Sequence, residues 1–422
     1  MVTRTPHLIN LLRGWPSPSL LPAAALTAAA ARALSDPTIS VPGLQYAPDP
    51  GFQPLREHLA AWLARFYGAA PEADGICITG GASQSLANML ASFTDPGFTR
   101  AIWMVAPCYF LACPIFEDAG FGGRLRAVPE DDDGANVEVL AQKLQELDEA
   151  WERDGRGAKP EDLKKSAHRK LYRHVIYLVP TCANPSGKTL PLRRREALVR
   201  LARAHDALLI ADDVYDLLQW PLTPAAAGTA SAPAPFPPRD PLLRLPRLSD
   251  VDAALPGQAP FGHAVSNGSF SKIVAPGVRT GWVAATPAFA QLAAVMVWEL
   301  LRSGELERRL VEESIPQLRE RHRRVLEAVE ALLVPLGVAG VRGADVADRG
   351  KELGVTVGAG DKFEVAGDED GARFEREVRI CFSWEEVEDV VEGVRRLGHA
   401  VRDVQQGKFV AGRRVDATCI EK

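Results

Sequence analysis

Short apolar runs alternate with amphipathic stretches along the first two thirds of this chain. Four runs have the length and character of buried strands, at residues 76–79, 102–105, 174–179 and 207–210. Between them, apolar residues recur every three or four positions, which is typical of helices, at residues 51–68, from 83 onward and at 192–205. This alternation predicts an α/β fold, a three-layer α/β/α large domain built on a mainly parallel sheet.

The remaining segments have different characters. Residues 221–262 are rich in Pro, Ala and turn signals, and predict an insertion that loops over the surface. A charged helix at 301–333 marks a boundary, beyond which short strands and helices predict a small α+β domain. We therefore expect residues 1–45 to form an N-terminal arm and part of the small domain, 46–300 the large domain, and 301–422 the small C-terminal domain.

The segment Ser269-Phe270-Ser271-Lys272 carries the most specific chemistry, with Arg279 seven positions after the lysine. An amine that forms a Schiff base, close to hydroxyl and cationic groups that hold a phosphate, is what pyridoxal 5'-phosphate (PLP) chemistry needs. On its own, a Ser-x-Ser-Lys would by default be interpreted as part of a surface loop. The PLP interpretation is favoured because complementary residues follow the predicted strands upstream, where α/β proteins place their sites.

Three strand ends carry side chains suited to the cofactor ring. Asp212 can keep the pyridine nitrogen protonated, and Tyr215 can hydrogen-bond the phenolic oxygen. Asn184 can donate to the same oxygen, and Tyr109 can stack on the ring. Each has an ordinary alternative: a helix N-cap for the Asp-Asp pair, a turn for Asn-Pro, and a core position for the tyrosine.

Further residues are suited to the phosphate and the substrate. Gly81, Ala82 and Ser83 enter a helix, whose N-terminus attracts anions, and Ser269, Ser271 and Arg279 would complete the phosphate site. Arg379 lies in the otherwise apolar run 378–383, which we expect to be a strand. It is either an edge-strand surface residue or a clamp for an amino-acid carboxylate.

Composition excludes several classes of function. The net charge of -5 in 422 residues gives no sign of a nucleic-acid partner, and no apolar run is long enough to span a bilayer. Six scattered cysteines without a Cys-x-x-Cys pair favour reduced thiols and a cytoplasmic protein, with a mitochondrial location left open. The Ala-rich stretch at 20–34 follows a proline cluster and predicts a helix rather than a signal peptide.

Taken together, the lysine segment, Asn184-Pro185 and Asp212-x-x-Tyr215 resemble the fold-type I PLP enzymes. The resemblance is to the class I/II aminotransferases, in the branch with 2-aminoadipate and aromatic aminotransferases, and residues 9–18 and 44–56 share it. It implies the PLP-transferase fold, Lys272 as the Schiff-base and catalytic lysine, and catalytic roles for Asp212 and Tyr215. It also implies that Gly14, Asn184 and Arg379 bind substrate. A homodimer with shared active sites is implied too, with Tyr46 reaching the phosphate of the neighbouring subunit.

The resemblance implies transfer of an amino group between an amino acid, aromatic or 2-aminoadipate-like, and a 2-oxo acid. Other PLP chemistry on the same fold, in a lyase, decarboxylase or synthase, stays open because fold does not decide reaction. The chain departs from the family after residues 337–343, where one small-domain strand is missing. A catalytically impaired homologue is therefore a further alternative.

Overall fold

The computed structural model describes residues 8–45, 48–68, 73–155, 163, 170–220, 238, 240–289, 307–308, 310–337 and 341–409. Internal contacts divide the chain into two compact units. The larger comprises residues 21–315 and 365–372, and the smaller comprises 1–20, 316–364 and 373–422. The folding domains proposed from the sequence, with boundaries near 45 and 300, remain a prediction.

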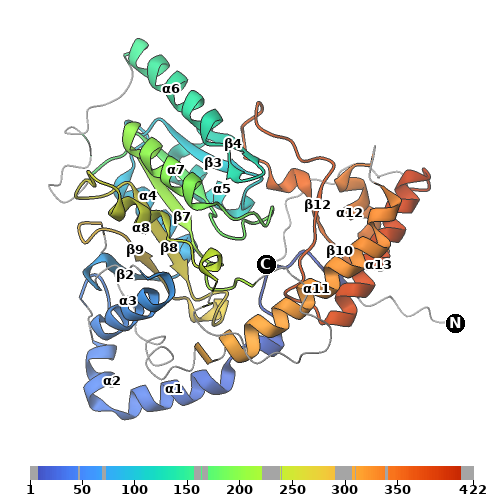
Figure 1. Ribbon diagram of the computed structural model, residues 1–422, viewed down its shortest axis with the longest axis horizontal. Coiled ribbons are helices and arrows are strands. Elements are labelled where there is room, and N and C mark those ends of the chain that lie inside the picture. The colour runs from blue at the N-terminus through green and yellow to red at the C-terminus, as the bar shows by residue number, and fades with distance from the viewer. Residues whose placement is uncertain are drawn as a thin grey trace. The chain divides into compact units, whose positions relative to one another are not determined.

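An eight-stranded sheet forms the centre of the larger unit (Figure 1). Its spatial order is β2 (Ile76–Thr79), β9 (Gly281–Ala284), β8 (Ala264–Ser269), β7 (Ala207–Asp212), β6 (His174–Leu178), β3 (Ala101–Ala106), β4 (Leu125–Asp131) and β5 (Gly134–Ala135). Strands β8, β7, β6, β3 and β4 are parallel, whereas β9 and β5 run the opposite way. The predicted mainly parallel sheet is confirmed.

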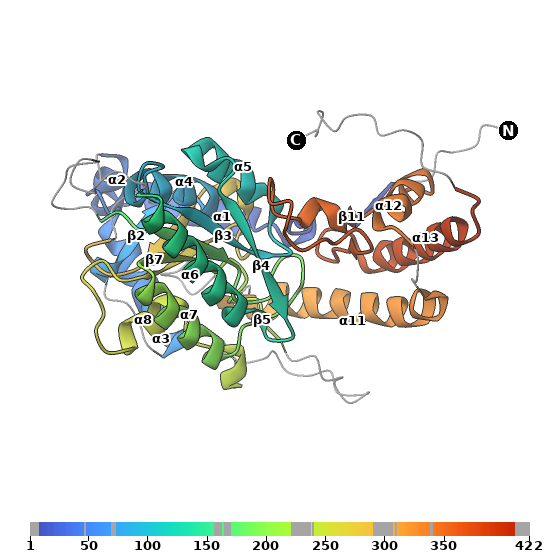
Figure 2. The ribbon, with the colours of Figure 1, turned by 90° about the horizontal axis from the view of Figure 1, so that it is seen from above.

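Helices cover both faces of this sheet. On one face α6 (Val137–Arg153), α7 (Leu192–Ala204) and α8 (Leu248–Ala254) enclose a core that includes Trp103, Ile176 and Leu209. On the other face α4 (Ala82–Phe93) packs on β2, β8 and β9, and α5 (Cys113–Phe116) packs on α4. Figure 2 shows α6 and α7 on the opposite side of the strands from α4 and α5. The predicted three-layer α/β/α architecture is therefore confirmed.

Strand direction decides where the site lies. Strand β2 is antiparallel to β9, and β9 is antiparallel to β8, so β2 runs in the same direction as β8. The carboxyl ends of β2, β3, β6, β7 and β8 consequently lie along one edge of the sheet. The motifs of the described residues that are predicted to hold the cofactor lie at or after these ends, and Arg279 precedes β9 at the same edge.

Two expectations for the larger unit need correction. Residues 248–254, expected in a surface insertion, form helix α8, and its buried Leu248 and Val251 pack into the core beside α7. Their spacing of three positions gives one apolar face, which the surrounding proline-rich sequence obscured. Residues 221–237 and 239 of the same segment lie outside the described residues. Asp212 is the last residue of β7 and does not follow the strand.

The smaller unit has its own core. Helices α11 (Ile315–Leu332), α12 (Gly343–Glu352) and α13 (Val387–Gln405) enclose Val325, Val346, Val394 and Leu397. Strand β1 (Ile9–Asn10) pairs with β10 (Val355–Thr356), and β11 (Gly358–Ala359) pairs with β12 (Val378–Arg379). The expected strand at 378–383 is thus only two residues long. Beyond the end of β12, the Cys381 N–H donates to the Leu11 carbonyl at 2.7 Å, and this bond does not belong to a pair of strands.

The N-terminal helices of the larger unit bury little. Helix α1 (Ala23–Ser35) has one buried residue, Ala29, and α2 (Pro37–Leu44) has none. Leu34, Val41 and Leu44 are 60%, 60% and 75% exposed. Helix α3 (Gln53–Tyr67), by contrast, buries an apolar face of the predicted spacing. None of the helices in the described part of the chain has both the length and the apolar character needed to cross a membrane.

Candidate active site

Asp212 is a buried carboxylate with one oxygen bonded and one not. Its Oδ2 accepts a 2.8 Å hydrogen bond from the Tyr177 hydroxyl of β6. Its Oδ1 is buried and has no hydrogen-bond partner among the described residues. Burial raises the pKa of Asp212 to about 6, against the lowering effects of the Tyr177 hydrogen bond and the Lys272 charge. A cationic N–H donor at Oδ1 would satisfy this oxygen.

Lys272 and Tyr109 lie near this carboxylate. The charge of Lys272 acts on Asp212, as its effect on the Asp212 pKa shows. Burial raises the pKa of Tyr177 well above its ordinary value, and the neighbouring Asp212 and Tyr109 raise it further. Tyr109 lies shortly after β3, beyond Pro107 and Cys108, and caps a short helical turn through its carbonyl, which accepts from the Ala112 N–H at 3.0 Å. The ends of β3, β6, β7 and β8 thus converge here.

The N-terminus of α4 and Arg279 form an anion-binding arrangement. The Arg279 Nη2 donates to the Gly80 carbonyl at 2.8 Å, which holds the guanidinium against the start of the helix. Gly81 has φ +103°, and a Cβ there would lie 2.9 Å from Arg279 Nη2, so glycine is required. A helix N-terminus and a guanidinium both carry positive charge, and placing them together favours an anion between them.

Two serines extend this arrangement. Ser269 Oγ donates to Ser271 Oγ at 2.9 Å and accepts the Ser271 N–H at 3.1 Å. Gly281 lets β9 lie close to β8 and to the start of α4, since a Cβ on Gly281 would lie 2.6 Å from the Gly268 carbonyl and 3.1 Å from Gly81 Cα. The set of donors is the one that phosphate groups bind in proteins.

Asn184 lies in a tight turn after β6. The Ala183 N–H bonds the Lys188 carbonyl at 2.9 Å, and the Gly187 N–H bonds the Ala183 carbonyl at 2.6 Å. Glu130 of β4 fastens the turn, because it accepts from Ser186 Oγ at 2.9 Å and pairs with Lys188 Nζ at 3.4 Å.

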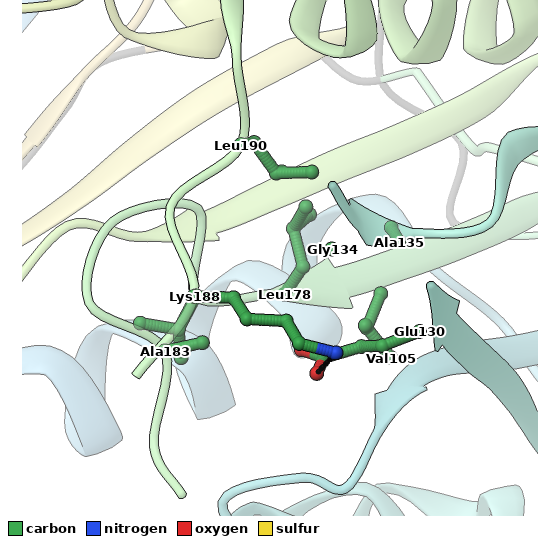
Figure 3. Close-up of a pocket in the computed structure, with 9 residues that line it drawn as sticks. Val105, Glu130, Gly134, Ala135, Leu178, Ala183, Lys188 and Leu190 are labelled. Atoms are coloured by element: carbon green, nitrogen blue, oxygen red, sulfur yellow. Dashed lines mark ion pairs between the residues drawn. The ribbon is translucent and has the colours of Figure 1, made fainter. Parts of the chain in front are cut away.

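Figure 3 shows Lys188 reaching across to Glu130 over a small pocket behind this turn. The pocket is lined by Val105, Glu130, Gly134, Ala135, Leu178, Val179, Ala183, Lys188 and Leu190. It contains none of the predicted site residues, so we assign it to support of the turn.

A second buried group of charges lies behind Asp212. Asp213 and Asp216 are 5% and 2% exposed, and Asp216 Oδ2 accepts from the Tyr67 hydroxyl of α3 at 2.7 Å. Burial raises the pKa of both carboxyls, and each is opposed by the charge of the buried Arg195. Arg195 in turn donates to Thr181 Oγ1 at 3.0 Å. These contacts connect the end of β7 to the Asn184 turn and to α3.

These observations fit PLP. The unpartnered Asp212 oxygen suits a pyridinium N–H, the Arg279–Gly81 arrangement suits a phosphate, and Lys272 lies close enough for its charge to act on Asp212. Tyr215 lies in the segment after β7, where its carbonyl accepts the Leu218 N–H at 2.8 Å.

The smaller unit brings together two residues predicted to bind substrate. A Cβ on Gly14 would lie 3.9 Å from Arg379 Nη1, so the guanidinium runs alongside Gly14. Arg379 also donates to the Leu12 carbonyl and lies over the Phe363 ring, 5.3 Å from its centroid. Both contacts hold the guanidinium in one orientation.

Most of the predicted site residues are therefore found at one sheet edge. Ala82 and Ser83 are the first residues of α4, whereas Tyr46 lies outside the described residues. Gly14 and Arg379 lie in the smaller unit. Sequence reasoning missed Tyr177 and the Glu130–Ser186–Lys188 fastening. A tyrosine inside a buried strand was the available signal, because its hydroxyl needs a partner there.

Comparisons with known proteins agree with this geometry. The family model "Aminotransferase class I and II" matches residues 17–326. An uncharacterized protein of Saccharomyces cerevisiae is 31% identical, over 92% of this chain and 96% of its own length. Aromatic-amino-acid aminotransferase 1 of Thermococcus litoralis is 25% identical, over 95% of this chain and 90% of its own length. The 2-aminoadipate transaminase of Thermus thermophilus is 28% identical, over 95% of this chain and 92% of its own length.

A solved structure shares the fold. The multiple substrate aminotransferase of Thermococcus profundus superimposes with a TM-score of 0.71 and 25% identity, over 96% of this chain and 93% of its own. The PLP-transferase fold expected from the sequence is thus confirmed. Since the family model covers most of the chain and the relatives match it nearly end to end, the chain belongs to the class I and II aminotransferase family and is a PLP-dependent aminotransferase.

Proposed function

We propose that this aminotransferase holds PLP at the sheet edge with the residues predicted from the sequence. Asp212 Oδ1 would accept the ring N–H, and Asn184 and Tyr215 would bond the phenolic oxygen. Tyr109 would cover the ring. The phosphate would bind Gly81, Ala82, Ser83, Ser269, Ser271 and Arg279, with Tyr46 added from the neighbouring subunit. The buried, unpartnered oxygen of Asp212 is the observation that carries this assignment.

Bound PLP supplies an electron sink for the bond that breaks at the substrate's α-carbon. Lys272 would have two roles: its amine would hold the cofactor, and in the substrate complex it would take the proton from the substrate's α-carbon. Asp212 would keep the ring nitrogen protonated. Arg379, with Gly14 and Asn184, orients the substrate by its α-carboxylate, and fixed orientation is worth several orders of magnitude in rate.

We propose donors with large or long side chains, aromatic or 2-aminoadipate-like, and a 2-oxo acid as acceptor. The names of the relatives support this choice, since they act on aromatic amino acids and on 2-aminoadipate. The exposed indole of Trp15, next to Gly14, also supports it.

An assay of amino donors with 2-oxoglutarate as acceptor tests the proposal. The PLP-loaded protein should convert L-phenylalanine, L-tyrosine or L-2-aminoadipate into the matching 2-oxo acid in equal amount to the L-glutamate formed. Lys272→Ala should lose at least ~10³-fold in rate, because both of its roles disappear. Ammonia or carbon dioxide released without an acceptor would instead indicate a lyase or decarboxylase.

We further propose a homodimer with shared active sites. Leu34, Val41 and Leu44 expose apolar side chains on helices that bury almost nothing, and such patches are typical of interfaces. Sedimentation should give twice the chain mass of 45.6 kDa; a single-chain mass at micromolar concentration would contradict the proposal.

A cytoplasmic location is proposed because six scattered cysteines without a Cys-x-x-Cys pair favour reduced thiols. Cell fractionation tests it, and recovery with mitochondria would overturn it.

A further inference from the structure

Asn267 is a buried amide inside strand β8 of the larger unit, and only 1% of it is exposed. Its Nδ2 donates to the carbonyl of Ala82, the first residue of α4, at 3.0 Å. Its Oδ1 is buried and has no hydrogen-bond partner in the part of the chain that the structure describes. A buried amide oxygen without a partner is unfavourable, so the stability of the strand does not by itself account for an asparagine at this position.

Asn267 also lies beside the carboxylate that is predicted to hold the cofactor ring. In the parallel pairing of β7 with β8, Asn267 is the residue opposite Asp212. Ala211 and Ala264 belong to the core beneath α7 and α8. Because side chains alternate along a strand, Asp212 and Asn267 both point to the other face of the sheet, on which α4 packs. The Asn267 carbonyl accepts the Asp213 N–H at 3.1 Å, which extends the pairing past the end of β7.

The turn that leads into α4 is held by a side-chain donor on each side of Gly81. Arg279 Nη2 donates to the Gly80 carbonyl at 2.8 Å, and Asn267 Nδ2 donates to the Ala82 carbonyl at 3.0 Å. The first N–H groups of a helix have no acceptor within the helix and are available to an anion. With the two flanking carbonyls fixed, these N–H groups are held in place before a ligand arrives, which lowers the entropic cost of binding it.

Asn267 thus contacts both ends of the proposed cofactor site. Its backbone pairs with the end of β7, which carries Asp212, and its side chain bonds the start of α4. The separation between the Asp212 carboxylate and the N–H groups of α4 therefore depends on this one residue. A cofactor that is bound at its ring nitrogen and at its phosphate needs that separation to be fixed closely.

We propose that Asn267 is a positioning residue for the cofactor, which holds the phosphate-binding start of α4 in place relative to Asp212. The proposal rests on the function proposed above, in which PLP lies along this edge of the sheet. Asn267 acts through Ala82 and through its pairing with β7, and it need not touch the cofactor. Loss of its amide should therefore weaken the contribution of the phosphate to binding, while Lys272 keeps its reaction with the aldehyde.

The test compares PLP with pyridoxal, which has the same ring and aldehyde but no phosphate. Absorbance titration of the full-length, cofactor-free protein gives a dissociation constant for each, and the ratio of pyridoxal to PLP measures the contribution of the phosphate. This ratio should be well above 1 in the wild type. In Asn267→Leu, which keeps the approximate volume but cannot donate, it should fall by about 3- to 10-fold, as expected for one lost hydrogen bond between neutral groups.

A second measurement needs no aldehyde. Calorimetry with inorganic phosphate on the cofactor-free protein should show binding to the wild type, and binding about 3- to 10-fold weaker in Asn267→Leu. Ser266→Ala is the matched control, because Ser266 is the preceding residue of β8, is equally buried and points to the opposite face of the sheet. It should match the wild type in both measurements.

The outcomes separate the two proposals. A folded Asn267→Leu protein that binds PLP and pyridoxal with the wild-type ratio, whether or not both bind more weakly, overturns the positioning role alone, because a general loss of structure affects both ligands equally. A wild type that binds PLP no better than pyridoxal contradicts the proposed phosphate site instead. Circular dichroism equal to wild type establishes that Asn267→Leu is folded, and if it is not, Asn267→Ala carries the comparison.

Discussion

At the scale of single residues, the buried charged side chains are held in place by specific hydrogen bonds and ion pairs. Asp148 of α6 illustrates this away from the cofactor. It accepts from His174 Nε2 and His205 Nδ1, both at 2.8 Å, and pairs with Arg100. The Trp103 Nε1–H donates to His174 Nδ1 at 3.2 Å, which leaves the proton of a neutral His174 on Nε2, facing Asp148.

Asp148→Asn should destabilise the protein by about 3 kcal/mol at pH 7, because it removes one partner from largely buried ion pairs. Burial raises the pKa of Asp148, but hydrogen bonds from the two histidines and the Arg100 charge outweigh it, and the net pKa lies below the ordinary value. A depressed folded-state pKa means that this stability is present above about pH 4 and is lost as the pH falls further.

Urea unfolding of both proteins at pH 7 and at pH 3.5 checks this. The difference in unfolding free energy between wild type and Asp148→Asn should be smaller at pH 3.5 than at pH 7. Glu149→Gln, an exposed neighbour on the same helix, serves as control and should change stability by less than about 0.5 kcal/mol. A difference between wild type and Asp148→Asn that is equal at the two pH values would contradict the assigned role.

Functional residues could be predicted from the sequence only where the chemistry of a site constrains their types. Lys272, Asp212 and Asn184 were predicted because their types and their order along the chain match a PLP site. Arg195, Asp213 and Asp216 were not, because an arginine in a helix and an Asp in a turn are ordinary surface residues until the fold buries them. Their partners come from elements far apart in the chain, which periodicity cannot relate.

At the scale of elements, strands were predicted well because buried parallel strands are short, continuous and apolar. Strands β2, β3, β6 and β7 fall within two residues of their predicted bounds. Helix α8 was missed because proline-rich sequence surrounds it, and the strand expected after Val378 ended early. In both cases the deciding interaction is tertiary.

Gly281→Ala tests how tightly β9 must approach its neighbours. A Cβ at this position would lie 2.6 Å from the Gly268 carbonyl, so β9 must move away from β8 and from Gly81. We expect a loss of about 1–3 kcal/mol in stability and weaker PLP binding, since the phosphate donors lie at this junction. Thermal unfolding and PLP titration measure the two effects.

Gly277→Ala is the matched control, because nothing lies within 4 Å of the position of its Cβ. It should leave both the melting temperature and PLP affinity close to wild type. Equal PLP affinity in Gly281→Ala and wild type would show that the close approach of β9 is unnecessary for the phosphate site.

At the scale of the whole molecule, the strand order assembles the site. Strands distant in sequence, such as β2 and β9, lie side by side and bring the α4 N-terminus to Arg279. The sequence predicted that the motifs follow strand ends, but not which strands are neighbours, because pairing depends on packing of the helical layers.

The central claim is that Lys272 is the residue that holds PLP. Borohydride reduction of the PLP-loaded protein, followed by peptide mass spectrometry, tests it most directly. We predict a phosphopyridoxyl group on Lys272 in the wild type, and on no lysine in Lys272→Ala. A label on another lysine, or none in a wild-type protein that binds PLP, would contradict the account.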